Sequence, residues 1–362
     1  MIKKNIFGKC YQFTSIREYK NLLEESVALY SNADDLNPDV EIHIDHTIRT
    51  DSPLSINPKI HKKLKNGMVT YFSQAVVFWS WDDSGCLKAE VRPIESTGLN
   101  RAINKFRSIE FPKRIETFEQ ILHELVLVTS VYFFSDIAPI HAASVKVKGK
   151  AFLFSGTGGA GKSSLLLALR RIEKITYLSD DITIVSDRGV AFGNMAWPKI
   201  YGYNCLGNNL KNEILANRGL IDSIHFNVRN RINPERVRRK IAPNKLYLYA
   251  ESSGVTIDAL YFLFRENVKK IKVSCLSIDD AIKMTISVMM AEYSVFHNFI
   301  RWEEFNSVAT GTKPMLTING VICVWRSIFI EAFSKINIFK VSLPFHIDNK
   351  EYQEKILKII NL

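Results

Sequence analysis

A run of small residues followed by a lysine and a serine is the strongest chemical signal in this sequence of 362 residues. It has the form Gly156-x-x-x-x-Gly161-Lys162-Ser163, the pattern of loops that bind nucleotide phosphates. Small residues let successive backbone N–H groups curl around an anion, and the N-terminus of a following helix adds partial positive charge. The lysine of such a loop contacts the β- and γ-phosphates, and the hydroxyl ligates Mg²⁺. We therefore expect a nucleoside triphosphate and Mg²⁺ to bind at Gly156, Thr157, Gly158, Gly159, Ala160, Gly161, Lys162, Ser163 and Ser164.

Two adjacent carboxylates, Asp180 and Asp181, follow the loop at the end of an apolar segment. A carboxylate at such a strand end can ligate Mg²⁺ or accept a proton from an attacking hydroxyl. Aspartate pairs are also common in turns, so the pattern alone equally allows an acidic turn. His141 precedes the loop, where a lone histidine is more often structural than catalytic.

The elements that such a loop requires are present in the pattern around it. The segment Ala151–Phe154 predicts a strand that leads into the loop, and the Leu/Ala-rich run after Ser163 predicts a helix. Residues Ile175–Asn194 predict two strands joined by a turn at Asp187-Arg188-Gly189. Further on we predict strands at 255–267 and 270–277, a helix at Ile278–Phe296, and a final strand followed by an amphipathic helix.

The first third of the chain has a different pattern. We predict a helix at Ser15–Tyr30, an antiparallel sheet, and a bridging helix at Ile115–Phe134. The predicted strands of that sheet are Val40–Thr50, Met68–Asp83 and Cys86–Ile94, the last two joined by a turn at Asp82-Asp83-Ser84-Gly85. This divides the chain into residues 1–134, a small α+β domain, and residues 135–362. An exposed sheet edge in the first part could capture an extended peptide.

The order of His141, the glycine loop and Asp180-Asp181 resembles the catalytic domain of the HPr kinase/phosphorylase family, which is related in fold to phosphoenolpyruvate carboxykinases. The fifteen-residue step from His141 to Gly156 and the "LSDD" element carry the resemblance, which covers about residues 135–362. It implies an α/β (α+β) fold, with an HPr-kinase-like P-loop domain and a smaller N-terminal α+β domain. The "E-x-R-G-x-G" signature of true HPr kinases is absent from the chain, so the resemblance does not extend to HPr as the substrate.

The resemblance also implies a reaction and a role for each residue. Asp180 would be the general base that takes the proton of an acceptor hydroxyl, and His141 would lie close enough to tune it. Lys162 would neutralise the β/γ-phosphates, while Ser163 and Asp181 would hold Mg²⁺. The reaction would transfer the γ-phosphoryl group to a Ser or Thr of a peptide or protein, or to a small biosynthetic molecule. No guanine-reading Asn-Lys-x-Asp motif occurs, so ATP is the expected donor, with GTP left open.

The net positive charge of the chain lies entirely in its second part. The net charge is +11, and residues 1–135 contribute none of it because their 17 basic and 17 acidic residues balance. The segment Arg229–Lys240 alone has a net charge of +5. It is either a solvated loop or an arginine-rich element that binds an acidic acceptor or contacts the transferring phosphoryl group. The candidate residues are Arg229, Arg231, Arg236, Arg238 and Arg239.

Three classes of function are therefore compatible with the sequence: a kinase, a regulatory module that binds or hydrolyses a nucleotide, and a nucleic-acid-associated NTPase. The last is less favoured because no nucleic-acid motif accompanies the basic segment. Neither an apolar signal region nor a run long enough to span a membrane occurs, so we expect a cytoplasmic protein. The five scattered cysteines predict free thiols. A homo-oligomer is compatible with the resemblance.

Overall fold

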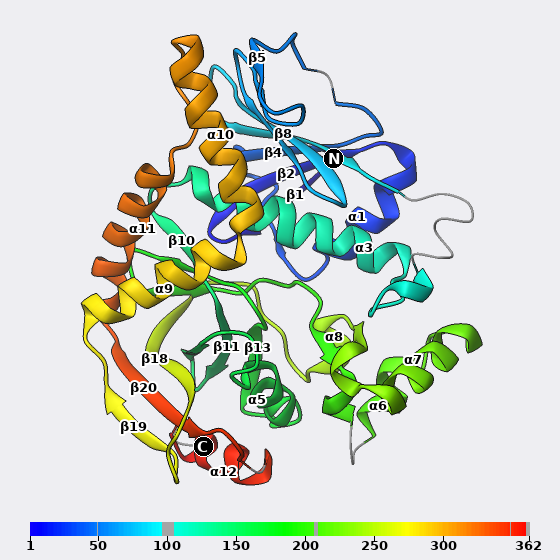
Figure 1. Cartoon of the computed structure of the whole chain (residues 1–362), viewed down its shortest axis with the longest axis vertical. Helices are drawn as coiled ribbons and strands as arrows, with labels where there is room; N and C mark the ends of the chain where they lie inside the picture. Colours follow the sequence, from blue (N-terminus) through cyan, green and yellow to red (C-terminus); the bar gives the residue numbers. More distant parts are fainter. Residues whose placement is uncertain (49, 96–104, 206–208, 348, 360–362) are drawn as a thin grey trace.

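Two large β-sheets and the helices packed on them form a mixed α/β structure of the α+β class (Figure 1). The computed structural model describes residues 1–48, 50–95, 105–205, 209–347 and 349–359. No helix in these ranges is both long enough and apolar enough to cross a membrane. All five cysteines are free, as predicted.

The first sheet contains the strands of residues 2–93, in the order β3-β1-β2-β4-β9-β8-β7-β6-β5. Strands β8 (Ala75–Trp81) and β9 (Leu87–Pro93) form the predicted antiparallel hairpin. The prediction of a wholly antiparallel sheet is wrong, because β4 (Val40–Ile44) pairs in parallel with both β2 and β9. The other strands are β1 (Ile2–Ile6), β2 (Lys9–Ser15), β3 (Ser31–Asn32), β5 (Ser55–Ile56), β6 (Lys62–Lys63) and β7 (Met68–Tyr71).

The predicted strand Met68–Asp83 is in fact the hairpin of β7 and β8. Its turn is formed by residues 72–74, where the Phe72 N–H donates to the carbonyl of Ala75. None of these residues is a Gly, Pro, Asn or Asp, so Ser73 alone gave a weak turn signal there.

A helical segment lies across this sheet and joins it to the rest of the chain (Figure 1). The helix predicted at Ile115–Phe134 runs as α3 (Arg114–Gln120), the π-helical η2 (Ile121–Leu127), α4 (Val128–Ser130) and η3 (Val131–Phe133). The helix predicted at Ser15–Tyr30 is shorter, because Ser15 still belongs to β2; it comprises η1 (Arg17–Tyr19) and α1 (Lys20–Val27).

The second sheet carries the glycine loop. Its order is β10-β14-β15-β18-β12-β11-β13, and β20 pairs with β18 and β19. Strand β12 (Lys150–Ser155) runs parallel to β18 and leads through the loop into α5 (Lys162–Leu169), which confirms the predicted strand, loop and helix. The other strands are β10 (Ile137–Ile140), β11 (Ala142–Val147), β13 (Ile175–Ser179), β14 (Thr183–Ser186), β15 (Val190–Phe192), β18 (Val255–Glu266), β19 (Lys272–Cys275) and β20 (Asn337–Pro344), and a separate small sheet pairs β16 (Lys199–Tyr201) with β17 (Arg238–Lys240).

The helices of the second part do not all pack on this sheet, because α10 (Ser294–Thr310) contacts β5, β6 and β7 of the first sheet (Figure 1). The predicted helix at Ile278–Phe296 ends earlier, as α9 (Ile278–Glu292), and is capped by the Ser277 hydroxyl, which accepts from the Asp280 N–H. The others are α6 (Leu210–Leu215), α7 (Leu220–Ile232), α8 (Pro243–Leu246), α10 (Ser294–Thr310), α11 (Ile318–Phe333) and α12 (Asn349–Ile359), with the short 3₁₀ turns η4 (Gly202–Cys205) and η5 (Pro234–Arg236).

The two parts of the chain share one hydrophobic core. A continuous cluster of buried side chains extends from Ile6 in β1 to Ile356 in α12. A buried ion pair of 2.6 Å joins Lys63 in β6 to Glu303 in α10. The first sheet therefore packs directly against the part of the chain that carries the glycine loop.

Candidate active site

The glycine loop adopts a conformation that only glycine tolerates at its two ends. Gly156 has φ 153°, and a Cβ there would lie 2.8 Å from the carbonyl oxygen of Leu263 in the adjacent strand β18. Gly161, the residue before α5, has φ 106°, and its Cβ would lie 3.2 Å from the Tyr352 hydroxyl of α12. The pattern thus reflects a backbone that curls tightly between β12 and α5, as a phosphate-binding loop does.

Lys162 closes this loop on itself. Its ammonium group donates to the carbonyls of Gly156, at 2.7 Å, and Thr157, at 3.3 Å. Burial lowers the pKa of Lys162, although the charges of Asp181 and Asp180 oppose this effect. The loop therefore holds a buried cation at the N-terminus of α5, where an anion would be attracted by both the ammonium and the helix dipole.

The other predicted loop residues divide by exposure. Thr157, Gly158 and Gly159 are exposed, whereas Ala160 is buried. The Ser164 hydroxyl accepts a hydrogen bond from the Asn204 side chain at 3.2 Å, so it is engaged by the protein itself.

Asp180 and Asp181 form the short link between β13 and β14, next to the start of α5. A buried cluster of three hydroxyls, Ser144, Ser179 and Thr183, lies where these strands meet β11. Thr183 also donates to the carbonyl of Ala142 at 2.9 Å. The strand end expected at the two aspartates is confirmed, but Ile175–Asn194 contains three strands, β13, β14 and β15, where two were predicted.

The two carboxylates have different partners. Asp180 lies against the Ser163 hydroxyl, and its Oδ1 is buried without a hydrogen-bond partner in the described structure. Asp181 accepts a hydrogen bond of 2.9 Å from the buried His141 ring, while 58% of its own side chain is exposed. His141 thus contacts Asp181, where the resemblance implied Asp180. The opposite edge of the His141 ring, Nδ1, lies 3.5 Å from the Glu292 carboxylate at the end of α9.

The pKa values of the adjacent carboxylates move in opposite directions. Burial, and then the charge of Asp181, raise the pKa of Asp180 to about 6, although the Ser163 hydroxyl acts against this. Desolvation also acts on Asp181, but the hydrogen bond from His141 and the charge of Lys199 hold its pKa below its usual range. Neighbouring groups whose environments separate their pKa values are typical of acid–base sites.

A cavity of about 450 Å³ opens beside these carboxylates, and we call it the inner cavity. Its polar lining includes Asp180, Asp181 and His141, together with three residues that the sequence analysis did not assign to the site: Glu124, Lys199 and Glu292. Lys199 forms a 2.5 Å ion pair with Glu124, which raises the pKa of Lys199 despite its burial. The aromatic lining is formed by Phe72, Trp197, Tyr293 and Phe296.

The residues present fit a Mg²⁺ ion bound together with a nucleotide. No three His, Cys, Asp or Glu side chains gather into a metal site of their own in the described ranges. Mg²⁺ is usually held by one or two carboxylates plus phosphate oxygens and water. The unpartnered Oδ1 of Asp180 and the Ser163 hydroxyl are oxygen ligands of that kind.

The arginine segment is largely engaged in internal contacts. Arg239 is fully buried, and its Nε donates to Asp222 at 2.7 Å. Arg238 donates to Glu110, also at 2.7 Å, and Arg229 donates to the carbonyl of Phe106 at 2.9 Å. Arg231 and Arg236 are exposed. None of the five is among the described residues that line the inner cavity. Their contacts thus make Arg238 and Arg239 part of the folded framework.

No protein-family model matches the sequence, and no curated protein matches it significantly.

Proposed function

We propose that this protein is a Mg²⁺-dependent kinase that transfers the γ-phosphoryl group of ATP to a hydroxyl group, with an HPr-kinase-like catalytic domain in about residues 135–362. One observation carries the proposal: the carboxylate pair lies between the glycine loop and the inner cavity. Asp180 faces Ser163 at the start of α5, and both aspartates line the cavity. A nucleotide switch needs only the loop and a metal, whereas a kinase also needs a proton acceptor and a space for the acceptor.

The contacts favour a division of roles that differs from the one implied by the resemblance. Asp180 is the better metal ligand, because P-loop enzymes hold Mg²⁺ with the loop Ser or Thr and a strand-end Asp. Asp181 is the better placed proton acceptor, because it is exposed and is oriented by His141, although its lowered pKa makes it the weaker base. Geometry comes before pKa in choosing a general base.

The reaction is then an in-line displacement at the γ-phosphorus. The acceptor oxygen forms a bond to phosphorus while its proton passes to Asp181, and the bond between the γ-phosphorus and the β–γ bridging oxygen breaks to release ADP. Lys162, freed from Gly156 and Thr157, balances charge on the β- and γ-phosphates. Bound Mg²⁺ supplies further neutralisation of the phosphate charge.

The proposal is tested by fluorescent mant-ATP binding with and without Mg²⁺, followed by phosphoryl transfer to a library of Ser- and Thr-containing peptides. We expect binding that depends on Mg²⁺. Asp180→Asn should raise the Mg²⁺ concentration required for binding. Asp181→Asn should leave it unchanged and lower kcat by roughly 100-fold or more. Nucleotide binding that is absent, or indifferent to Mg²⁺, would contradict the proposal.

A further inference from the structure

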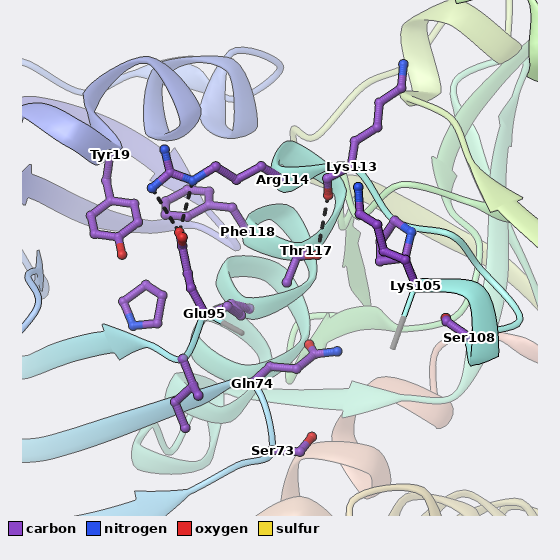
Figure 2. Close-up of a pocket in the computed structure, with 14 residues that line it drawn as sticks. Tyr19, Ser73, Gln74, Glu95, Lys105, Ser108, Lys113, Arg114, Thr117 and Phe118 are labelled. Atoms are coloured by element: carbon purple, nitrogen blue, oxygen red, sulfur yellow. Dashed lines mark hydrogen bonds and ion pairs between the residues drawn. The ribbon is translucent and has the colours of Figure 1, made fainter. Parts of the chain in front are cut away.

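A second cavity adjoins the inner one and has no role in the chemistry described above. This outer cavity of about 380 Å³ lies between the first sheet and α3 (Figure 2). Ser73 and Gln74 line both cavities. They belong to the turn between β7 and β8, where Ser73 is exposed. The two cavities are therefore neighbouring compartments that meet at this turn, and the inner one is lined by Asp180 and Asp181.

The floor between the compartments is polar and continuous. Gln74 donates to Gln120 at 3.5 Å, and Gln120 donates to Glu124 at 2.9 Å. Glu124 in turn pairs with Lys199 beside the catalytic carboxylates. Lys240 also donates to the Gln120 amide oxygen, at 2.6 Å, which holds the floor in place.

The outer cavity has apolar walls and a basic edge. Tyr19 and Phe118, whose rings stack at 5.8 Å, form part of the wall. Arg114 is paired with Glu95 on one side, and Lys105 lies on the opposite side (Figure 2). No carboxylate pairs with Lys105 among the described residues; its ammonium lies 5.4 Å from the ring centre of Phe111. The fourth charged lining residue is Lys113, whose ammonium donates to the Asn217 carbonyl.

The two compartments thus have opposite electrostatic character. The inner cavity is lined by Asp180, Asp181, Glu124 and Glu292 against the cations Lys199 and, when protonated, His141. An acidic group is repelled there and attracted toward Lys105 at the far end.

We infer that the two compartments form one groove and that this groove binds an extended peptide. The reacting Ser or Thr lies in the inner cavity. An apolar side chain of the peptide, flanked by an acidic residue, lies in the outer cavity. The inference rests on the proposed kinase function and selects a peptide over a small molecule as the acceptor. Each cavity alone has the volume of a small-molecule site, so a small acceptor would leave the outer one empty. An extended chain advances about 3.3 Å per residue, so the residues that flank the Ser or Thr reach beyond the inner cavity.

The test separates binding from transfer. The immobilised full-length protein, with Mg²⁺ and the non-hydrolysable analogue AMP-PNP, captures peptides from a library with one fixed Ser or Thr and random flanking positions. Captured peptides are identified by mass spectrometry and then incubated with ATP. N-acetyl-serine amide serves as the small acceptor.

Two variants of the outer half are compared with a matched control. Ser73→Trp fills the junction of the compartments, whereas Asp83→Trp places the same side chain in the exposed turn at the other end of β8. Lys105→Glu reverses the charge of the basic edge. Circular dichroism and mant-ATP binding verify that each variant is folded.

We expect the wild type and Asp83→Trp to capture peptides with an apolar and an acidic residue on the same side of the hydroxyl residue. Ser73→Trp should lose this capture, and Lys105→Glu should lose the acidic preference. Capture without selectivity, or selectivity unchanged in both variants, would refute the groove. Phosphorylation of N-acetyl-serine amide without capture of any peptide would also refute it and leave the kinase proposal intact. Selective capture without transfer would instead uphold the groove and overturn the kinase proposal.

Discussion

Replacing Asp180 by asparagine should make the protein more stable at neutral pH while impairing its metal site. The pKa of Asp180 is raised from 3.8 to about 6 by burial and by the charge of Asp181. One pKa unit corresponds to about 1.4 kcal/mol, so ionised Asp180 costs the folded state about 3 kcal/mol at most. Because the residue keeps some contact with solvent, we expect a measured gain of about 2 kcal/mol for Asp180→Asn at pH 8.

The sign of the pH dependence follows from proton binding. Between pH 3.8 and about 6 the folded protein holds the Asp180 proton more tightly than the unfolded chain does. The contribution of this group to stability is therefore greatest below pH 3.8, falls as the pH rises, and reaches its full penalty above about pH 6. In Asp180→Asn that penalty is absent.

Urea unfolding of both proteins at pH 5 and pH 8, without nucleotide or metal, measures the effect. The stability difference between Asp180→Asn and the wild type should be larger at pH 8 than at pH 5, by about 1 kcal/mol or more. Ser163→Ala keeps the Asp180 carboxylate and removes a hydrogen bond that lowers its pKa, so its stability should fall between pH 5 and pH 8 at least as steeply as that of the wild type. A difference between Asp180→Asn and the wild type that is the same at both pH values, or an asparagine variant less stable than the wild type at pH 8, would refute the reasoning.

Three further predictions concern the loop and the framework. Lys162→Ala should weaken mant-ATP binding by roughly tenfold or more without unfolding the protein; unchanged binding would exclude the loop as the phosphate site. Lys63→Met, which leaves Glu303 buried without its partner, should cost about 3 to 5 kcal/mol in urea unfolding, and adding Glu303→Leu should restore most of it; a small loss in the single variant would contradict this. Arg239→Ala should lower the melting temperature measured by calorimetry, whereas Arg236→Ala, at an exposed position, should not. A larger decrease for Arg236→Ala than for Arg239→Ala would contradict the structural role of Arg239.

The parts of the fold that followed from the sequence are those set by local chemistry. The strand, loop and helix around Gly156 and Lys162 were predicted because glycine spacing and apolar runs are short-range signals. The end of β13 at Asp180 was expected, but β14 as a separate strand was not, because both segments are mostly apolar and only their pairing with different strands separates them. Parallel pairing of β4 was also invisible, since the partner of a strand is a long-range property.

Some residues of the site could not be predicted either, because only the folded structure brings them together. Glu124 and Glu292 lie in helices that were predicted from apolar spacing alone, so a carboxylate on them had no distinguishing mark. Lys199 follows Pro198 in a segment that only the folded chain brings beside Asp180 and Asp181. Arg239 shows the opposite case. A dense basic run is compatible with a solvated loop, and its buried partner Asp222 belongs to no motif that would have indicated the ion pair.

Two buried groups of the site have incomplete partners. The Lys162 ammonium is buried and bonded only to backbone carbonyls of its own loop, while Asp180 Oδ1 is buried with no partner in the described structure. Asp180 and Asp181 are near enough to act on the pKa of Lys162, but Lys162 forms no direct ion pair with them in the described structure, and a buried charge with incomplete partners is unfavourable. A magnesium–triphosphate unit corrects both at once, because its phosphates satisfy the lysine and its metal satisfies the aspartate. Phosphate alone or Mg²⁺ alone corrects only one, so the two should bind cooperatively, and this coupling should disappear in Asp180→Asn.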